Sequence, residues 1–567
     1  MFAHILIVII AAIAISAFAE RRNIQPAILV AMVGLAASFI PGLPKLELEP
    51  EIILGIVLPP MLFSAASDFS FTSFARRLGS IVNLGVFMVF ASTFAVGVVA
   101  AGFVPELSLP AALVLAAVLA PPDAVTAITI GRKAGLPSGL MTILKGESLI
   151  NDAAALTIFA AAVAAVAGTH AFIDSLPLYF LYSSVVGILL GLIIGNFAQF
   201  VRRKLGNPSL STVISVIVPF AAYLLAEELH ASGVLAVVTA GFAVGHHAVE
   251  ASYQERMQER QFWRTADTLL ETFVFAYIGL QLRFVITEAG EAGIDMVTLL
   301  WAATAVFFAT VAIRFIWVFG TAVFGRWRYR GKLVRWDQYK AAIARGEDPF
   351  AQKGRAARRE RSGARQGRRP RPEAPQPPLS WKENIVLSWT GMRGVVTLAA
   401  ASGVPAVTAS GLSFPGREAI LAIAFLVTIA TLLIQGLTLP WLIRTLDLND
   451  PMAEKYLAEQ EELAHTLADE AASEALLEYG RTHDSPATRR IVERMAQRYK
   501  LTAAAEKPER AFNQEEAFAL GNLMLAARRK RLITARDERV LDDTVLRDVL
   551  DEMDLEQAFL DSRSKPA

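Results

Sequence analysis

Long apolar runs recur along the chain and are separated by short polar connections. The runs are residues 2–19, 26–41, 51–67, 80–104, 110–130, 138–167, 177–201, 210–228, 232–247, 268–286, 296–324, 385–404 and 417–443. Each has about the length at which a helix crosses the roughly 30 Å hydrocarbon layer of a membrane. The pattern therefore predicts an all-α polytopic membrane protein with about thirteen transmembrane helices.

The first run, 2–19, ends in Ala-Phe-Ala, which resembles a signal-peptidase site. A signal peptide carries its positive charges before its apolar core. Here the first positive charges, Arg21 and Arg22, follow the core. We therefore interpret this run as the first transmembrane helix, with a signal peptide as the alternative.

Lys and Arg alternate between the successive connections. Connections after even-numbered runs contain only Lys45, Arg283 and Arg417, whereas those after odd-numbered runs contain about 29 Lys and Arg. Loops rich in Lys and Arg remain on the cytoplasmic side of a membrane. The alternation predicts a multi-pass protein of the cell (inner) membrane, with the amino terminus outside and everything after residue 444 in the cytoplasm.

Two predicted cytoplasmic segments differ from the apolar runs. One is a loop within the transmembrane domain, 1–445, and the other is the tail, 446–567. Within the domain, the Arg- and Pro-rich loop 326–384 is predicted to be a disordered linker. The alternative is that its positive charge binds anionic lipid headgroups or nucleic acid. Of these two, nucleic acid is not an expected partner. The tail has apolar positions at helical spacing, which predicts amphipathic helices that pack together, with regulation or dimer contact as the alternative. Examples are Val545, Val549 and Met553, and Leu546, Leu550 and Phe559.

Composition agrees with a membrane protein, since 54% of the residues are apolar and the mean hydropathy is +0.44. The chain has no cysteine, which excludes disulfides, thiolate metal sites and thiol redox chemistry. The net charge of +1 hides an uneven distribution, because basic residues gather in the loops and acidic residues in the tail.

Few ionisable residues fall inside the apolar runs, and each costs about 2.5–3.5 kcal/mol near the centre of a membrane helix. They are therefore candidates for function. They are Asp123, Lys145, Glu147, Asp152, Arg314 and Arg393, with Asp68 and Glu271 nearer the cytoplasmic ends and Glu227, Glu228 and His230 nearer the outer end.

The sixth run carries the densest polar set. At about 100° per residue, Glu147, Ser148, Asn151 and Asp152 form one stripe of the helix, which must face protein or water. Ser148 and Asp152 are one turn apart, so a hydroxyl and a carboxylate can hold one small cation beside the carbonyl of Asn151. Because no His or Cys is near, oxygen ligands for a hard cation are favoured over a transition-metal site.

The fifth run contains Pro121 and Pro122, which deprive a helix of donors and interrupt it close to mid-membrane. Such a break frees carbonyls that can complete a cation shell, and Asp123 lies at the break. An ordinary proline kink, with Asp123 bonded to freed amides, is the alternative.

The twelfth run has a corresponding break, with Gly391 and Gly394 around Arg393. Two inverted six-helix repeats around a central seventh helix would place these two broken helices in equivalent positions, crossing at one site. A buried arginine needs a carboxylate, and we predict that Glu147 forms a structural salt bridge with Arg393.

Taken together, these segments resemble the cation:proton antiporter family that includes the sodium/proton exchangers, in particular its bacterial branch. The resemblance covers about residues 2–445 and rests on motifs in the family's order. They are LPPMLF (58–63), PPDAV (121–125), GESLINDA (146–153), HASGVLAVVTAGF (230–242), FVFAYIGLQL (273–282), Arg314 and GMRGVVTLA (391–399).

The resemblance implies a homodimer in which a core of spans four to six and eleven to thirteen moves like an elevator against a dimerisation domain. It implies that Asp152 binds cation and proton in turn, that Asn151 supports it and that Ser148 is a further ligand of a monovalent cation. Asp123 would act through water. The Asn151-Asp152 pair resembles that of the electroneutral type, which exchanges one cation for one proton. Such a protein is a secondary transporter, with no catalytic residues and no cofactor, whose partners are cations, protons and the bilayer.

Two residues depart from the family pattern. Pro122 replaces a threonine that many exchangers carry before this aspartate, and Ser64 stands where some members have a glutamate. Pro122 can still offer its carbonyl, but the choice among sodium, lithium and potassium is left open. The alternatives are a potassium/proton antiporter and a non-transporting cation sensor. An intramembrane aspartyl protease that uses Asp123 and Asp152 is disfavoured, because no Gly-x-Gly-Asp sequence surrounds either residue.

Overall fold

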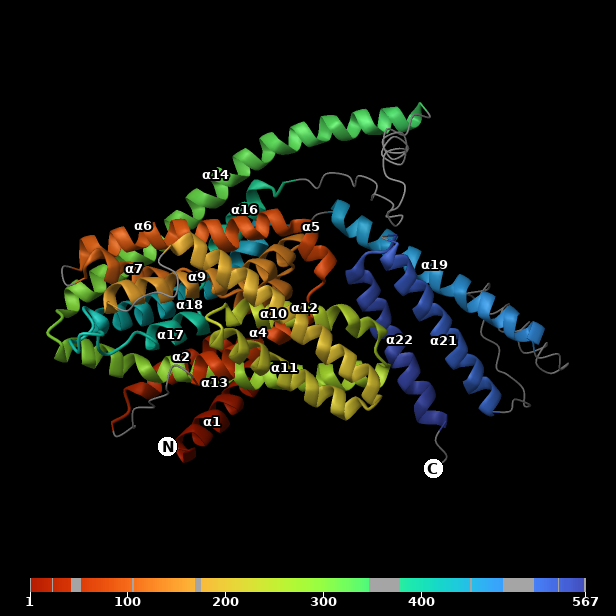
Figure 1. The fold of residues 1–567 in the computed structure, drawn as a ribbon, viewed down its shortest axis with the longest axis horizontal. Coiled ribbons are helices and arrows are strands. Elements are labelled where there is room, and N and C mark those ends of the chain that lie inside the picture. The colour runs from red at the N-terminus through yellow and green to blue at the C-terminus, as the bar shows by residue number, and fades with distance from the viewer. Residues whose placement is uncertain are drawn as a thin grey trace.

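The computed structural model describes residues 2–22, 24–41, 52–104, 107–168, 175–345, 378–448, 451–482, 514–538 and 540–564. These residues form helices joined by short connections, together with one isolated bridge between Val407 and Ser413 (Figure 1). The fold is therefore all-helical over the described part of the chain.

The helices follow the apolar runs in order. They are α1 (Phe2–Arg21), α2 (Pro26–Ser38), η1 and α4 (Ile53–Val57, Leu58–Ser67), α5, η2 and α6 (Phe71–Val82, Asn83–Phe87, Met88–Phe103), α7 (Leu109–Leu119), α8 (Ala124–Ala134), α9 (Ser138–Ala167), α10 (Leu176–Leu205), α11 (Pro208–Glu228), α12 (Gly233–His247), η3 (Ala248–Glu250), α13 (Tyr253–Glu291), α14 (Met296–Ala344), α16 (Trp381–Trp389), α17 (Val395–Ser402), α18 (Arg417–Leu446), α19 (Pro451–Thr482), α21 (Gln514–Asp537) and α22 (Asp543–Ser564).

Seven helical stretches of the described residues are long and apolar enough to cross a membrane. They are Phe71–Phe103, Gly139–Ala167, Pro177–Leu205, Pro208–Glu228, Tyr253–Glu291, Met296–Ala342 and Arg417–Leu446. Four shorter apolar helices are Pro26–Ser38, Ile53–Ser67, Leu109–Leu119 and Gly233–His247. The chain is thus a helical protein with several candidate membrane spans, and the count of thirteen stays a prediction.

Two of the expected spans are each divided into two short helices. The first break separates α7 from α8 at residues 120–123, and the second separates α16 from α17 at 390–394. The breaks meet, because the backbone N–H of Asp123 donates to the carbonyl of Met392 at 2.6 Å. The prediction that the prolines interrupt the fifth run is confirmed, and the two breaks are in contact; the crossing of the broken helices stays a prediction. The inverted repeat that would relate them stays a prediction.

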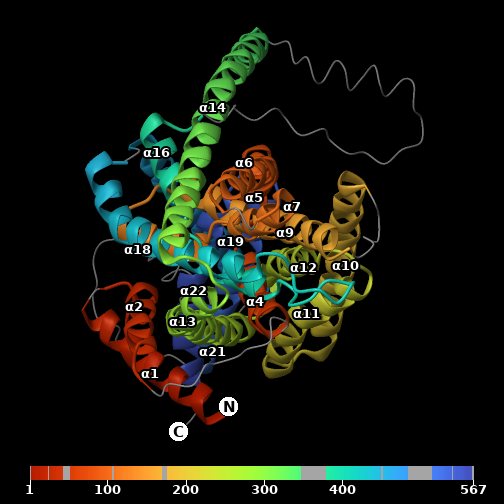
Figure 2. The same ribbon diagram turned by 90° about the vertical axis from the view of Figure 1, so that its left-hand side faces the viewer.

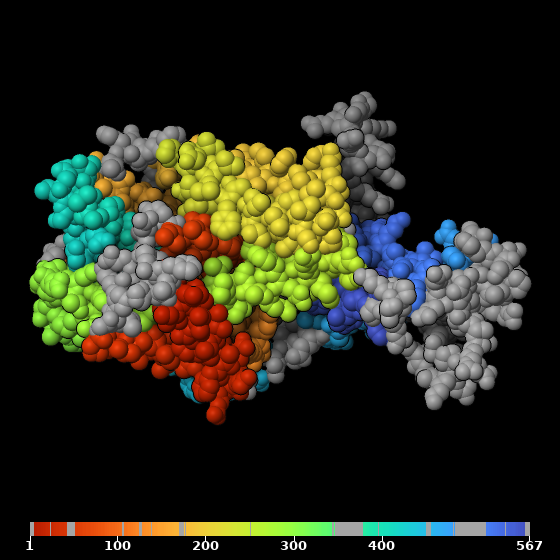
Figure 3. Space-filling view, turned by 90° about the horizontal axis from the view of Figure 1, so that it is seen from below, coloured from red at the N-terminus to blue at the C-terminus, as the bar shows by residue number. Residues whose placement is uncertain are grey.

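Close helix packing holds α13 beside the first two helices. At Gly279 an added Cβ would overlap the backbone of Ala31 and Gly34, so only glycine permits this approach of α13 to α2. In Figure 3 the red amino-terminal helices lie directly against the yellow-green α13, with the yellow helices α10 and α11 beyond it. Figure 2 shows α5, α6, α7, α9, α14 and α18 grouped on another side of the molecule.

The structure corrects one boundary of the predicted cytoplasmic loop 326–384. Helix α14 does not end near residue 324 but continues to Ala344, and Figure 1 shows it projecting from the bundle. The extension contains Trp336, whose ring lies near that of Tyr339, and it has no proline or glycine after Gly331 to stop the helix. Residues 346–377, which hold most of the predicted linker, lie outside the described part of the chain.

The tail helices α19, α21 and α22 pack against one another, and α22 packs against the amino-terminal part of α13 (Figure 1). Of the apolar positions predicted to pack, Val545, Leu546, Val549, Leu550 and Met553 are buried. Phe559 is 54% exposed, so the second stripe ends before it.

A buried ion pair fastens α22 to α13. Asp554 accepts two hydrogen bonds from the guanidinium of Arg256, one of them 2.8 Å long, and a third from Arg529 at 2.8 Å. The side chains of Arg256 and Asp554 are each only 8% exposed. By contrast, the neighbouring pair Arg260–Asp551 is nearly half exposed on both sides.

Asp554→Ala is therefore expected to release α22 from α13. Removing one partner of a buried pair costs about 3–5 kcal/mol, because the remaining charges stay buried without compensation. We expect trypsin to cleave the tail of the detergent-solubilised variant at least tenfold faster than that of the wild type. Asp551→Ala is the matched control, since an exposed pair contributes about 0.2–1 kcal/mol. Equal cleavage of the two variants would refute a fastening role for Asp554.

Candidate functional site

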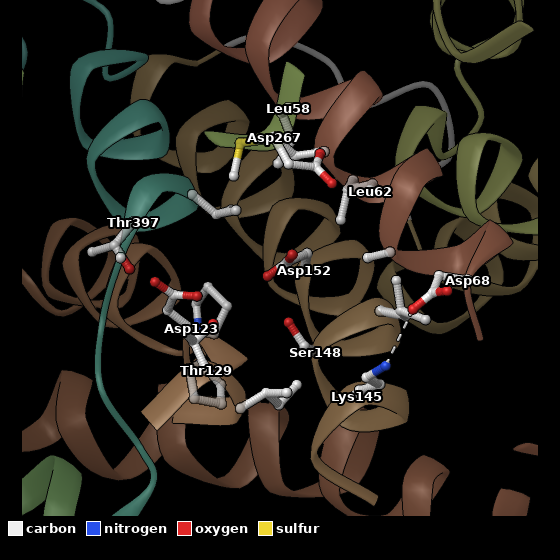
Figure 4. A pocket seen from close by; sticks show the side chains of 18 of the residues that line it. Leu58, Leu62, Asp68, Asp123, Thr129, Lys145, Ser148, Asp152, Asp267 and Thr397 are labelled. Atoms are coloured by element: carbon white, nitrogen blue, oxygen red, sulfur yellow. Dashed lines mark ion pairs between the residues drawn. The ribbon is translucent and has the colours of Figure 1, made fainter. Parts of the chain in front are cut away.

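An inner cavity of about 260 Å³ lies where the two breaks meet. It is lined by residues of α4, α8, α9, α13 and α17 and of both breaks. Figure 4 shows Ser148 and Asp152 on one side of this cavity, with Asp123 and Thr397 facing them. Pro121 and Pro122 also line it. Four of the predicted cation- or proton-binding residues therefore border one cavity: Ser148, Asp152, Asp123 and Pro122.

The four residues of the predicted polar stripe of α9 lie in three different environments. Ser148 and Asp152 line the inner cavity, and Asp152 is 5% exposed. Asn151 is fully buried, and its side-chain amide donates to the carbonyl of Pro122 at 3.3 Å. Glu147, also buried, points to α14 instead. Asn151 thus ties α9 to the first break, while Ser148 and Asp152 present their oxygens to the cavity.

The first break is held closely against the second. Asp123 donates its backbone N–H to Met392, and its side chain packs so closely on Gly394 that any Cβ at residue 394 would overlap it. Glycine at 394 is required for this approach. In Figure 4 the carboxylate of Asp123 extends toward the cavity that Asp152 enters from the other side.

The predicted salt bridge between Glu147 and Arg393 is wrong in its partner. Glu147 pairs with Arg314 of α14, through two parallel hydrogen bonds of 2.5 and 3.0 Å. Arg314 also donates to the carbonyl of Leu387 at 3.0 Å, which links α14 to α16. The planar guanidinium of Arg314 matches both oxygens of the carboxylate, an arrangement that favours it over a single contact.

Arg393 itself lies in the extended second break. Its backbone N–H donates to Thr431 at 3.0 Å, while Nε and Nη1 of its buried side chain have no hydrogen-bond partner among the described residues. Arg314 is thus the observed partner of Glu147, and Arg393 is buried nearby without a partner for Nε or Nη1 among the described residues.

Several cavity residues were missed by the sequence analysis, and two of them bear on the chemistry of the site. Asp267 lines the cavity because α13 begins at residue 253 and places it within the helix, whereas the apolar run was taken to start one residue after it. The capping box formed by Ser252 and Glu255 marks that earlier start and could have revealed it. The second is Thr397 on α17, which no charge distinguishes in the sequence.

Asp267 lies beside Ser64, the position where the family pattern has a glutamate in some members. Ser64 donates to Asp267 Oδ2 at 2.6 Å, and the buried Oδ1 has no hydrogen-bond partner in the described part of the chain. A carboxylate is therefore present here, although it comes from α13 rather than α4.

An outer cavity of about 590 Å³ adjoins the inner one. The two share Asp68, Arg132, Lys145 and Asp267 as lining residues, and tail residues of α22, including Asp551, line the outer one. The inner cavity therefore opens toward the side on which the tail packs. Lys145 lies 3.7 Å from Asp68 across this passage.

The chemistry of the inner cavity is that of oxygen ligands. It offers the carboxylates of Asp123, Asp152 and Asp267 and the hydroxyl groups of Thr129, Ser148 and Thr397, while Asp68, Arg132 and Lys145 lie where it adjoins the outer cavity. Among the described residues, no three His, Cys, Asp or Glu are grouped closely enough to hold a metal ion as a fixed centre. Such a set suits a hard, loosely held cation.

Comparison with protein families identifies residues 5–445 as a match to the transmembrane sodium/hydrogen exchanger family. The chain belongs to this family. The match covers the whole helical domain that contains the inner cavity, and the family is one of cation/proton antiporters. The resemblance inferred from the motifs is thereby confirmed.

Known relatives of this family member extend over most of its length. An uncharacterised sodium/proton exchanger of Mycobacterium tuberculosis is 30% identical over 98% of this chain and 96% of its own. The sodium/proton antiporter ApNhaP of Aphanothece halophytica is 28% identical over 76% of this chain and 72% of its own. A sodium, potassium, lithium and rubidium/proton antiporter of Bacillus subtilis is 29% identical over 73% of this chain and 57% of its own.

The fold also has a solved counterpart. The sodium proton antiporter MjNhaP1 of Methanocaldococcus jannaschii superposes with a TM-score of 0.55, covering 78% of this chain and 98% of the other, at 16% identity. The likeness shows a shared antiporter fold.

Proposed function

We propose that this protein exchanges a monovalent cation for a proton across the cell membrane, and that Asp152 binds the two in competition. The proposal rests on the surroundings of the Asp152 carboxylate. Asp152 is buried at an oxygen-lined cavity, and within the described residues no Lys or Arg forms an ion pair with it. Glu147, five residues earlier on the same helix, has its arginine.

A buried carboxylate without a cationic partner explains the coupling. Its charge is costly in surroundings of low dielectric constant, so the site is stable when a proton or a cation neutralises it. If the site crosses the membrane barrier only in a neutralised form, an empty charged site cannot return. Exchange then becomes obligatory.

The other residues take roles that follow from their contacts. We propose that Ser148 is a cation ligand, that Asn151 fixes the Pro122 carbonyl at the site, and that Asp123 acts through water. Asp267 would attract cations from the outer cavity. The pair Glu147–Arg314 would hold the frame without carrying ions, because its two hydrogen bonds already occupy both carboxylate oxygens.

The finer features remain part of the proposal. The Asn151-Asp152 pair supports electroneutral exchange, and the contact between the two breaks supports an elevator motion of a core that contains them, within a homodimer. The distribution of Lys and Arg supports an amino terminus outside and a cytoplasmic tail.

Sodium is the cation we propose first, since the relatives named above include sodium/proton antiporters, and potassium is the alternative. The test is exchange by purified protein in liposomes with an imposed pH gradient. We expect added sodium to dissipate the gradient, with no change in membrane potential. A pH gradient unaffected by sodium, lithium and potassium would refute the proposal.

A further inference from the structure

Thr397 presents a hydroxyl group to the inner cavity that the chain itself does not satisfy. The residue is 1% exposed, and its Oγ1 has no hydrogen-bond partner among the described residues. Figure 4 shows it beside Asp123, across the cavity from Ser148 and Asp152.

The local fold explains why this hydroxyl is free. A threonine inside a helix commonly donates to the carbonyl four residues earlier, as Thr157 does to Ala153 and Thr428 to Ala424. Thr397 is the third residue of α17, so the residue four positions before it, Arg393, lies in the extended break. No helical carbonyl is available there.

We propose that Thr397 Oγ1 is a ligand of the transported cation. The inference rests on the proposed function and adds a residue to it. A buried hydroxyl without a partner is unfavourable, and valine has the same shape without that cost. The hydroxyl therefore has its partner in what enters the cavity, and its oxygen carries the partial negative charge that a hard cation requires.

The contact between the two breaks brings Thr397 close to Asp123. Pro122, which precedes Asp123, has neither a hydroxyl nor a backbone N–H. The contact of Asp123 with Gly394 brings the first turn of α17 to this aspartate. The helix that follows the second break thus supplies a hydroxyl beside the first.

Thr397→Val is expected to weaken cation binding without preventing exchange. The loss of one uncharged ligand should raise the sodium concentration that gives half the maximal rate by about five- to thirtyfold. The maximal rate should stay within about twofold, because Asp152 remains. Thr397→Ser, which keeps the hydroxyl, should restore the wild-type half-saturating concentration.

The matched control is Thr310→Val. Thr310, on α14, is also buried with an unpartnered hydroxyl but does not line the inner cavity. Thermal unfolding in detergent separates binding from folding. Thr397→Val should unfold at or above the wild-type temperature without sodium, because valine lacks the unpartnered hydroxyl, and should gain less stabilisation when sodium is added. Thr310→Val should gain as much as the wild type.

The outcomes distinguish this inference from the function on which it rests. If the wild type exchanges cations and Thr397→Val has the same half-saturating concentration, the ligand role is overturned and the proposed function stands. If Thr310→Val weakens sodium binding equally, the effect belongs to the fold and the ligand role is again overturned. A wild type that exchanges none of the three cations overturns the function itself. Should the valine variant not fold, Thr397→Ala provides the same comparison with Thr397→Ser.

Discussion

Asp152→Asn is expected to abolish cation-driven proton movement while leaving the protein folded. The amide has nearly the same shape as the carboxylate, but it neither gains a proton nor supplies the charge that a cation needs. Since no other described residue neutralises this position, the exchange rate should fall by roughly a hundredfold or more. Vesicles that contain the variant should show no change of internal pH when sodium, lithium or potassium is added.

Asp68→Asn is the matched control for this substitution. Asp68 also lines the inner cavity, but its side chain is 76% exposed and it lies 3.7 Å from Lys145. We expect this variant to keep at least half of the wild-type exchange rate. An Asp152→Asn protein that exchanges as fast as Asp68→Asn would remove Asp152 from the mechanism.

The sequence predicted those features that depend on local backbone geometry alone. Pro121 and Pro122 cannot continue a helix, so the first break follows from their chemistry alone. Likewise, the spacing of Ser148 and Asp152 fixes them on one face of α9 wherever that helix lies. The sequence also placed the two breaks at one site, through an inverted repeat that stays a prediction, and the structure brings the breaks into contact at Asp123 and Met392.

What could not be predicted depends on how segments meet in space. Glu147 pairs with Arg314, which lies on α14, far from both residues of the predicted pair in the sequence. Asp267 reaches the cavity because α13 starts well before its apolar portion. The free hydroxyl of Thr397 depends on where α17 begins. Neither hydropathy nor charge gives these boundaries to within one turn.

Glu147→Gln is expected to destabilise the fold more than any other single change considered for the cavity region. The substitution leaves the buried guanidinium of Arg314 without its carboxylate. Removing one partner of a buried ion pair costs about 3–5 kcal/mol, a large part of the stability of a typical domain. We expect a marked fall in the unfolding temperature in detergent and a low yield of folded protein.

The unfolding temperature in detergent also distinguishes the observed pair, Glu147–Arg314, from the predicted pair, Glu147–Arg393. Arg314→Met removes the direct partner of Glu147 and leaves that carboxylate buried beside Arg393 alone, which makes no hydrogen bond to it among the described contacts. Arg393→Met removes an arginine whose Nε and Nη1 have no partner, so it relieves the burial of an excess charge. The first variant should therefore unfold at a lower temperature than the second. The reverse order would mean that Glu147 is held chiefly by Arg393, as the position of both residues in the sequence had suggested.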